Sequence, residues 1–341
     1  MKRTIFLFLI FCWPLASHAA VDPLQAIYES RSDLQQAFDS KTKIAKPDSR
    51  AGFLMDLEDW ARQYGWQEYA KELAAYAPVT QPPKAGKIIA PEISAGNYIV
   101  VDSTSGIVLA ADDADAVWPI ASITKLMTAQ VSLQRGVSLD KTVAMSASDN
   151  VGGAALSVTD GAIFTMTDLF SAMLMSSANN AANAIARSSG PDFIVGMNTR
   201  ARELHLVNTA FVDASGIDPR NVSTAREVAA MAEAAFTFEP IQKNTTTVAK
   251  DIQAPNEDNA HHLKTTNWML YYPEYDDVYV TAGKTGYLEE SGWNLVVRLR
   301  PSASEKQKEL TIVTFNSTSR ADSFKDAEAL ADWVWTSYTY P

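Results

Sequence analysis

Hydrophobic and polar residues alternate in two parts of this chain that lie far apart in the sequence. In the earlier part, Tyr98–Asp102 and Ile107–Ala110 flank the turn residues Ser103–Gly106, a pattern typical of an antiparallel hairpin. Further strand-like segments come much later, near Val278–Val280, Trp293–Leu299 and Leu310–Phe315. The alternation therefore predicts strands at both ends of one domain.

Between these two parts, apolar residues recur every three or four positions, as they do on one face of a helix. This spacing extends from Ile120 to about Phe238, and a last helix is expected from about Ser319. Thr224 and Glu227 have the spacing of a capping box, which predicts a helix start at Thr224. The element order predicts an α+β fold in which one antiparallel sheet is built from both chain ends, with an inserted helical subdomain.

The first residues have the features of a secretory signal peptide, which we expect to span residues 1–19. Lys2 and Arg3 precede the apolar run Ile5–Leu15, and small residues typical of a cleavage site follow it. The run is shorter than the roughly 20 apolar residues that a helix needs to span a bilayer. The sequence therefore favours export over membrane insertion.

Residues 20–80 have the apolar spacing of helices, and Asp22 followed by Pro23 is typical of a helix start. The aromatic residues from Trp60 to Tyr76 could stack on sugars, but this spacing is more often the core of a helical hairpin, which is the preferred interpretation. Prolines then gather around residues 81–94, which we expect to be a linker. A second domain is expected over residues 95–340.

Composition and charge exclude several classes of protein. The chain is 47% hydrophobic and 20% charged, as expected of a globular protein and not of a disordered, collagen-like or polytopic membrane protein. Its formal charge of -11 argues against nucleic acid as a partner, because binding to phosphates needs positive charge. Loss of the signal peptide would also remove Cys12, the one cysteine, so no disulfide is expected.

Ser122 and Lys125 are the first candidates for catalysis. They are three residues apart, so on a helix they share a face, and the amine can reach the hydroxyl. A serine needs a base beside it, and an amine can serve when burial or a second cation lowers its pKa. The Ser-x-x-Lys pattern alone is weak, because it recurs at Ser40 and Ser138. A helix cap followed by a solvated lysine would also fit.

The second candidate is Lys284-Thr285-Gly286, expected at the end of a strand over residues 278–282. A twist at Gly283 and Gly286 would let both polar side chains address a ligand, and the missing Cβ would let a substrate backbone approach. A phosphate loop is excluded, because it needs a glycine five residues before Gly283, where Val278 stands.

The third candidate is Ser177-Ala178-Asn179, which lies at a predicted break between two helices. Ser148-Asp149-Asn150 is a competing match, but Ser177 has the apolar surroundings of a buried helix junction and is preferred. Metal chemistry is not expected, since His205 sits alone on a helix and His261 and His262 are adjacent. No metal and no cofactor is therefore predicted.

In this order the three motifs resemble those of the serine penicillin-recognising enzymes, whose fold is β-lactamase/transpeptidase-like. The resemblance covers roughly residues 95–340 and is greatest to the low-molecular-mass penicillin-binding proteins, the D-Ala-D-Ala carboxypeptidases and endopeptidases. Pro119–Thr128 looks like their active-site segment, and Met173–Ala182 looks like the endopeptidase branch. Phe211–Gly216 and Asn221–Arg226 are further family-like segments.

This resemblance implies a role for each candidate. Ser122 would attack the carbonyl of a D-alanyl peptide bond and form an acyl-enzyme, and Lys125 would take its proton. Ser177 and Asn179 would line the groove. Lys284, Thr285 and Gly286 would bind the substrate's carboxylate end, and the N–H groups of Ser122 and Tyr287 would bind the oxyanion. Arg320 and Lys325 are further candidates for binding the carboxylate.

The resemblance leaves several functions open. The preferred one is a periplasmic D-Ala-D-Ala endopeptidase that acts on peptidoglycan peptide stems and is inhibited covalently by β-lactams. A carboxypeptidase comes second, because many of these carry an additional C-terminal β domain and a membrane-binding amphipathic helix, whereas here only one helix is expected after the last strand. A β-lactamase would need a second base, and Glu203 with Asn208 fits that pattern poorly. The last alternative is a catalytically inactive protein that senses penicillin or binds the cell wall. Apart from its substrate, the protein could also have a loosely bound partner in the membrane or cell wall.

Overall fold

The computed structural model describes residues 90–338 and Tyr340. The expected signal peptide, the helical region over residues 20–80 and most of the linker lie outside the described residues, so these expectations and the domain limits stay predictions. Within the described part, no helix is both long enough and apolar enough to cross a membrane.

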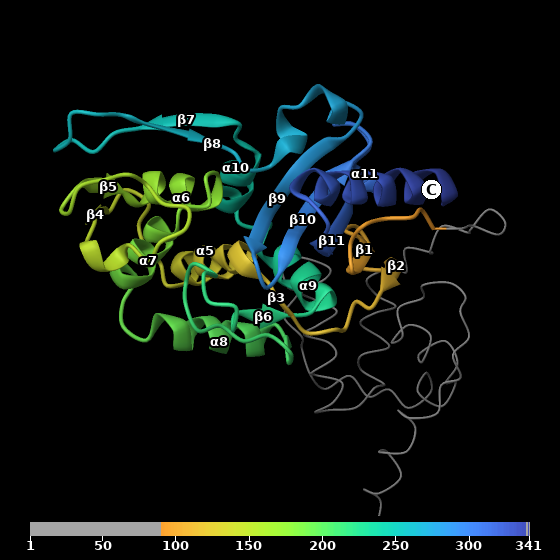
Figure 1. Cartoon of the computed structure of the whole chain (residues 1–341), viewed down its shortest axis with the longest axis horizontal. Coiled ribbons are helices and arrows are strands. Elements are labelled where there is room, and N and C mark those ends of the chain that lie inside the picture. Colours follow the sequence, from red (N-terminus) through yellow and green to blue (C-terminus); the bar gives the residue numbers. More distant parts are fainter. Residues whose placement is uncertain (1–89, 339, 341) are drawn as a thin grey trace, which may run out of the picture.

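A five-stranded antiparallel sheet lies at the centre of the described residues, with the strand order β2-β1-β11-β10-β9. β1 pairs along its whole length with β11, so that Asn97 lies opposite Phe315 and Asp102 opposite Leu310. Segments from the two ends of the described chain therefore lie side by side (Figure 1). The prediction of one sheet built from both ends is confirmed. Its strands are β1 (Asn97–Asp102), β2 (Val108–Asp112), β9 (Tyr279–Leu288), β10 (Gly292–Arg300) and β11 (Leu310–Ser317).

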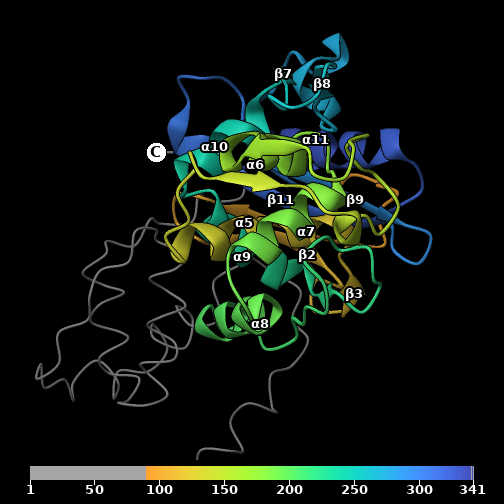
Figure 2. The same cartoon turned by 90° about the vertical axis from the view of Figure 1, so that its left-hand side faces the viewer.

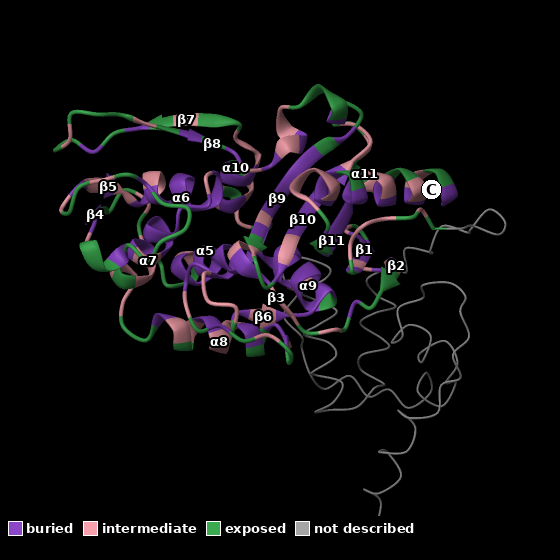
Figure 3. Cartoon of the chain, viewed as in Figure 1, coloured by how far each residue is buried: buried purple, intermediate pink, exposed green. Residues whose placement is uncertain are grey.

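The two faces of the sheet belong to two hydrophobic cores, because successive side chains of a strand point to opposite faces. On β10, Leu295 and Val297 pack with the helix α11 (Arg320–Ser337), whereas Val296 packs with the helical insertion. α11 lies on one side of the sheet, and α5 (Thr124–Gln134) and α9 (Ala225–Ala235) lie on the other (Figure 2). Each fully buried Leu or Val contributes roughly 1.5–3 kcal/mol, so the sheet is held from both sides. The strands β9 and β10 and the helix α5 are largely buried (Figure 3).

The insertion between β2 and β9 is mainly helical, as the spacing predicts. It also contains short two-stranded ladders that the spacing did not predict, in which β3 pairs with β6, β4 with β5 and β7 with β8. The helices are α5 (Thr124–Gln134), α6 (Met166–Leu174), α7 (Asn179–Ser188), α8 (Phe193–Glu203), α9 (Ala225–Ala235) and α10 (Glu239–Thr246). The short strands are β3 (Trp118–Pro119), β4 (Thr142–Ala144), β5 (Ile163–Thr165), β6 (Val222–Ser223), β7 (Ala249–Ile252) and β8 (His261–Lys264).

The predicted capping box at the start of α9 is half right. Thr224 caps the helix, because its hydroxyl accepts a hydrogen bond from the N–H of Glu227. The Glu227 carboxylate instead accepts from the backbone N–H of Asn208 and from the Thr209 hydroxyl. This carboxylate therefore fastens the loop before β6 to α9.

Candidate active site

Ser122 lies in a 3-10 turn, Ala121–Ile123, that continues directly into α5. The preceding residue, Ala121, has a left-handed φ of 49°, a conformation that costs a non-glycine residue of order 1–3 kcal/mol. Packing holds this turn in place, since Gly216 and Gly286 both lie against it with no room for a Cβ. The serine is therefore presented by a strained turn whose position is fixed by its neighbours.

Lys125 is completely buried, and its amine lies 2.7 Å from the Ser122 hydroxyl oxygen. The amine also lies 2.8 Å from the side-chain oxygen of Asn179 and 2.5 Å from the carbonyl oxygen of Ser215. Burial is the main cause that holds the pKa of Lys125 well below its ordinary value, and the positive charge of Lys284 lowers this pKa further. Asp213 acts in the opposite direction.

These contacts suit a neutral amine. Such an amine has two N–H bonds and one lone pair. The oxygens of Asn179 and Ser215 accept the two N–H bonds, which leaves the lone pair for the hydroxyl proton of Ser122. The geometry is thus that of a base beside a nucleophile.

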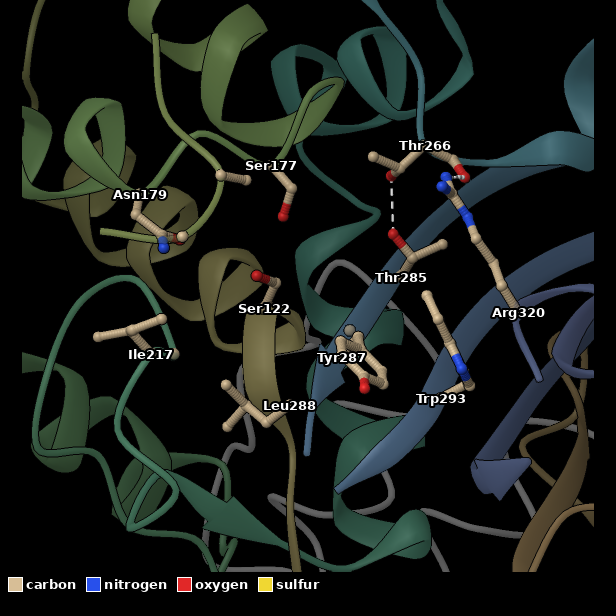
Figure 4. A pocket seen from close by; sticks show the side chains of 14 residues that line it. Ser122, Ser177, Asn179, Ile217, Thr266, Thr285, Tyr287, Leu288, Trp293 and Arg320 are labelled. Atoms are coloured by element: carbon tan, nitrogen blue, oxygen red, sulfur yellow. Dashed lines mark hydrogen bonds between the residues drawn. The ribbon is translucent and has the colours of Figure 1, made fainter. Parts of the chain in front are cut away.

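Ser177 precedes α7 and, like Ala121, has a left-handed φ, here 61°. Its hydroxyl accepts a hydrogen bond of 2.9 Å from the amine of Lys284, which is almost fully buried. Burial and then the charge of Arg320 lower the pKa of Lys284 to about 7. The hydroxyls of Ser122 and Ser177 face the same space (Figure 4).

The sequence predicted Lys284, Thr285 and Gly286 at the end of a strand. They lie instead within β9, which extends without a break to Leu288. A Cβ on Gly286 would lie 2.8 Å from the Ile120 carbonyl oxygen and 3.3 Å from the Ser122 nitrogen. The missing Cβ therefore lets the protein's own backbone approach, and it brings β9 against the turn that holds Ser122.

One end of the site is polar and cationic. The hydroxyls of Thr285 and Thr266 are 2.7 Å apart, and the Thr266 carbonyl oxygen accepts a 2.8 Å hydrogen bond from Arg320 (Figure 4). Arg320 begins α11, so this helix brings a guanidinium to the edge of β9. A guanidinium keeps its charge at all ordinary pH values.

The opposite end of the site is apolar, because Leu288 and Ile217 line it on the far side of Ser122 from Arg320 (Figure 4). Between the two ends, Tyr287 stacks on Trp293, with ring centroids 4.2 Å apart and planes inclined by 28°. Ser122 therefore lies between a cationic end and an apolar end.

All of these groups surround one cavity of about 280 Å³. Ser122, Ser177, Asn179, Thr285, Gly286 and Tyr287, all predicted as site residues, line it. The predicted Lys125 and Lys284 reach it through their contacts with Ser122 and Ser177. None of the described residues that line the cavity is acidic.

The competing candidates lie elsewhere. Asp149, in the middle of the alternative Ser-Asp-Asn match, accepts two hydrogen bonds from Arg187 and does not line the cavity. Glu203 is the last residue of α8, pairs with Arg200 and is more than half exposed. Neither group is placed to act on a substrate beside Ser122.

Sequence reasoning missed the loop that holds the lysine. The Asp213 carboxylate accepts hydrogen bonds from the backbone N–H groups of Ser215, Gly216 and Asp218. This fixes the carbonyl that accepts from Lys125. The family-like segment Phe211–Gly216 signalled the loop but not this role. Thr266 gave no signal at all, because its contact with Thr285 joins the loop after β8 to a residue of β9 that lies 19 positions further along the chain.

Comparison with known sequences agrees with this geometry. Residues 84–319 match the profile of a peptidase family described as D-alanyl-D-alanine carboxypeptidase. The chain belongs to this family. The family predicted from the three ordered motifs is thereby confirmed.

Individual relatives include both kinds of peptidase. The chain is 30% identical to a D-alanyl-D-alanine endopeptidase of Pseudomonas aeruginosa, over 77% of this chain and 84% of the relative. It is 27% identical to a D-alanyl-D-alanine carboxypeptidase of Bacillus subtilis, over 72% of this chain and 64% of the relative. A solved D-alanyl-D-alanine carboxypeptidase of Mycobacterium tuberculosis superposes with a TM-score of 0.66 at 26% identity, covering 75% of this chain and 96% of that one. The predicted fold class is confirmed.

Proposed function

We propose that this protein is a serine D-Ala-D-Ala endopeptidase that hydrolyses D-alanyl cross-links of peptidoglycan through an acyl-enzyme on Ser122. The observation that carries the proposal is the buried, pKa-lowered amine of Lys125, 2.7 Å from the Ser122 oxygen. With both its N–H bonds accepted by fixed oxygens, this amine has only the serine proton left to bind.

In the first half of the reaction, the Ser122 oxygen forms a bond to the D-alanyl carbonyl carbon while its proton passes to Lys125. The tetrahedral intermediate then expels the amine of the leaving peptide, which needs a proton. Ser177, whose hydroxyl accepts a hydrogen bond from Lys284, is suited to relay that proton from Lys125 to the leaving amine. In the second half, water attacks the ester and releases Ser122.

The developing oxyanion is assigned to the backbone N–H groups of Ser122 and Tyr287. The close packing of Gly286 on the Ser122 turn supports this assignment, because it brings these two backbone segments together. One such donor is worth roughly 3 kcal/mol in the transition state.

The carboxylate next to the leaving nitrogen is assigned to the cationic end of the cleft. Thr285 offers a hydroxyl there, and Lys284 and Arg320 supply positive charge. This end gives the substrate its direction: the leaving group lies towards Arg320, and the acyl part lies towards Leu288 and Ile217.

An endopeptidase is preferred to a carboxypeptidase because the endopeptidase of Pseudomonas aeruginosa matches at higher identity and over more of its length. A β-lactamase is disfavoured by the absence of an acidic residue among the described residues lining the cavity, since rapid deacylation requires such a base. The expected signal peptide would take the enzyme to the periplasm, where peptidoglycan stems are its substrate and β-lactams its covalent inhibitors.

The test is covalent labelling with a fluorescent penicillin, followed by digestion of cross-linked muropeptides. The wild-type protein should be labelled and should cleave the cross-linked dimer. Ser122→Ala should abolish both, whereas Ser148→Ala, a serine outside the cleft, should retain both. Labelling of Ser122→Ala at the wild-type rate would refute the proposal.

A further inference from the structure

A row of aromatic rings continues from the cationic end of the cleft to the surface. Arg320 lies over the ring of Trp268, with its guanidinium carbon 4.7 Å from the centroid. Trp268 meets Tyr272 edge-on at 5.2 Å, and Tyr272 lies beside Tyr271 at 4.7 Å. The amine of Lys264 lies 4.1 Å from the centroid of the Tyr271 ring. We call Lys264, Trp268, Tyr271 and Tyr272 the aromatic shelf.

The shelf is fixed to the active site at two points. Trp268 stacks on Phe324 of α11, one turn after Arg320, with the ring centroids 5.6 Å apart. The carbonyl oxygen of Lys264 accepts a hydrogen bond from the hydroxyl of Ser176, the neighbour of Ser177. Most of the shelf belongs to the segment between β8 and β9, which lies beside the start of β9 (Figure 1).

Charge indicates what the shelf binds. The chain has 40 acidic and 29 basic residues, and several of the described cations, among them Arg187, Arg226 and Lys250, pair with a carboxylate. Within the described residues, Arg320 and Lys264 contact a carbonyl oxygen and aromatic rings but no carboxylate. Lys264 is exposed, as is Tyr272 at 40%. Two unneutralised cations joined by aromatic rings suit an anionic peptide.

We propose that the aromatic shelf binds the second peptide stem of a cross-linked substrate, with Lys264 paired to one of its carboxylates. This proposal rests on the proposed endopeptidase function. When a single D-alanine leaves, the substrate ends at Arg320. When a cross-link is cut, the leaving amine belongs to another peptide, which has to continue past Arg320, and the shelf is the surface that begins there. The rings would cover the peptide while Lys264 fixes its charge.

The test compares two substrates on one enzyme. Lys264→Ala and Lys264→Glu are measured with a purified cross-linked muropeptide dimer and with an uncross-linked pentapeptide stem that loses one D-alanine. Lys308→Ala is the matched control, because Lys308 also lies over a tyrosine ring, that of Tyr340, but near the far end of α11. Labelling by fluorescent penicillin checks that each variant keeps a working Ser122.

For the dimer, kcat/KM should fall about fivefold in Lys264→Ala and more than tenfold in Lys264→Glu, as expected for loss and reversal of one exposed charge pair. The pentapeptide and the penicillin should react within twofold of wild type, and the loss on the dimer should shrink in 1 M salt. Equal losses on both substrates, or no loss on the dimer, would overturn the proposal.

Failure of the proposed function would look different. In that case the wild-type protein would release D-alanine from the pentapeptide, or take no penicillin, without cutting the dimer. Binding of the intact dimer to Ser122→Ala would then test whether the aromatic shelf binds the second stem. The proposal is supported if Ser122→Ala binds the dimer more tightly than the single stem and if adding Lys264→Glu to this variant removes the difference. Equal binding of the two would overturn the proposal.

Discussion

The backbone of Gly216 lies directly against the carbonyl oxygen of Ala121, the residue before Ser122. Gly216 has a φ of +80°, and Ala121 one of +49°. Two left-handed residues therefore meet where the loop that holds Lys125 touches the turn that holds Ser122. This contact joins the loop whose Ser215 carbonyl oxygen accepts a hydrogen bond from Lys125 to the turn that carries Ser122.

Gly216→Ala should disrupt this contact, because the new Cβ would collide with the backbone of Ala121. We expect a loss of at least about 2 kcal/mol in the free energy of unfolding and a roughly 100-fold slower reaction with penicillin. Gly136→Ala is the control, since Gly136 has a φ of +71° with open space around its Cβ position. It should lose about 1 kcal/mol and keep the acylation rate. Equal acylation rates in both variants would contradict this reading.

Asn179 and Asn180 form a second matched pair. Asn179 accepts from Lys125 and donates to the Gly152 carbonyl oxygen, whereas Asn180 bonds only to the backbone of Leu156. Asn179→Ala should slow acylation about 100-fold. Asn180→Ala should lower the free energy of unfolding by about 1–3 kcal/mol and leave acylation within threefold. Stopped-flow labelling and urea denaturation measure the two effects, and similar acylation in both variants would argue against a role for Asn179 at Lys125.

The pH dependence of hydrolysis should reveal Lys284. Its pKa of about 7 in the free enzyme means that it loses its charge above neutral pH, so kcat/KM for a carboxylate-bearing stem should fall from about pH 7 upwards. A bound carboxylate favours the charged amine and raises this pKa, so kcat should fall only at higher pH. In Arg320→Gln the repulsion is gone, and the fall in kcat/KM should also move to higher pH. If kcat/KM fell at the same pH in Arg320→Gln as in the wild-type protein, the fall would belong to a group other than Lys284.

The same lysine should make stability depend on pH. Its pKa is about 7 when folded and about 10.4 when unfolded. Between these values the unfolded state binds more protons, so this lysine raises stability with pH by up to about 1.4 kcal/mol per unit. Lys284→Met lacks this dependence. Urea denaturation at pH 6 and pH 9.5 should show that the free energy of unfolding of the wild-type protein increases relative to that of the variant as pH rises. The same difference at both pH values would refute the argument that burial lowers the pKa of Lys284.

The parts of the site that depend on local spacing could be predicted from the sequence. Ser122 and Lys125 meet because residues three apart on a helix share a face, and Ser177 stands at the helix break that its neighbours indicate. The alternation of apolar residues also gave the strands of both chain ends. These predictions need only one helical turn or one strand.

The parts that depend on packing could not be predicted. Arg320 was a candidate for binding the carboxylate, but the sequence could not place it relative to Ser122. Its position beside Thr266 follows from how α11 packs on the sheet. The missing Cβ of Gly286 was expected to admit a substrate backbone, whereas in the structure it makes room for the protein's own backbone at Ile120 and Ser122. Such contacts join residues whose distance in the sequence carries no pattern.

The strand β11 lies between β1 and β10 and is the last of the described strands to be synthesised. Until the ribosome has released it, the early hairpin has no partner and β10 remains an unprotected edge. Folding of this sheet therefore has to wait until β11 has been synthesised, and such distant pairing is slow. A chain terminated before Leu310 would leave the edges of β1 and β10 unpaired. Truncated products should therefore aggregate or be degraded instead of accumulating as inactive enzyme.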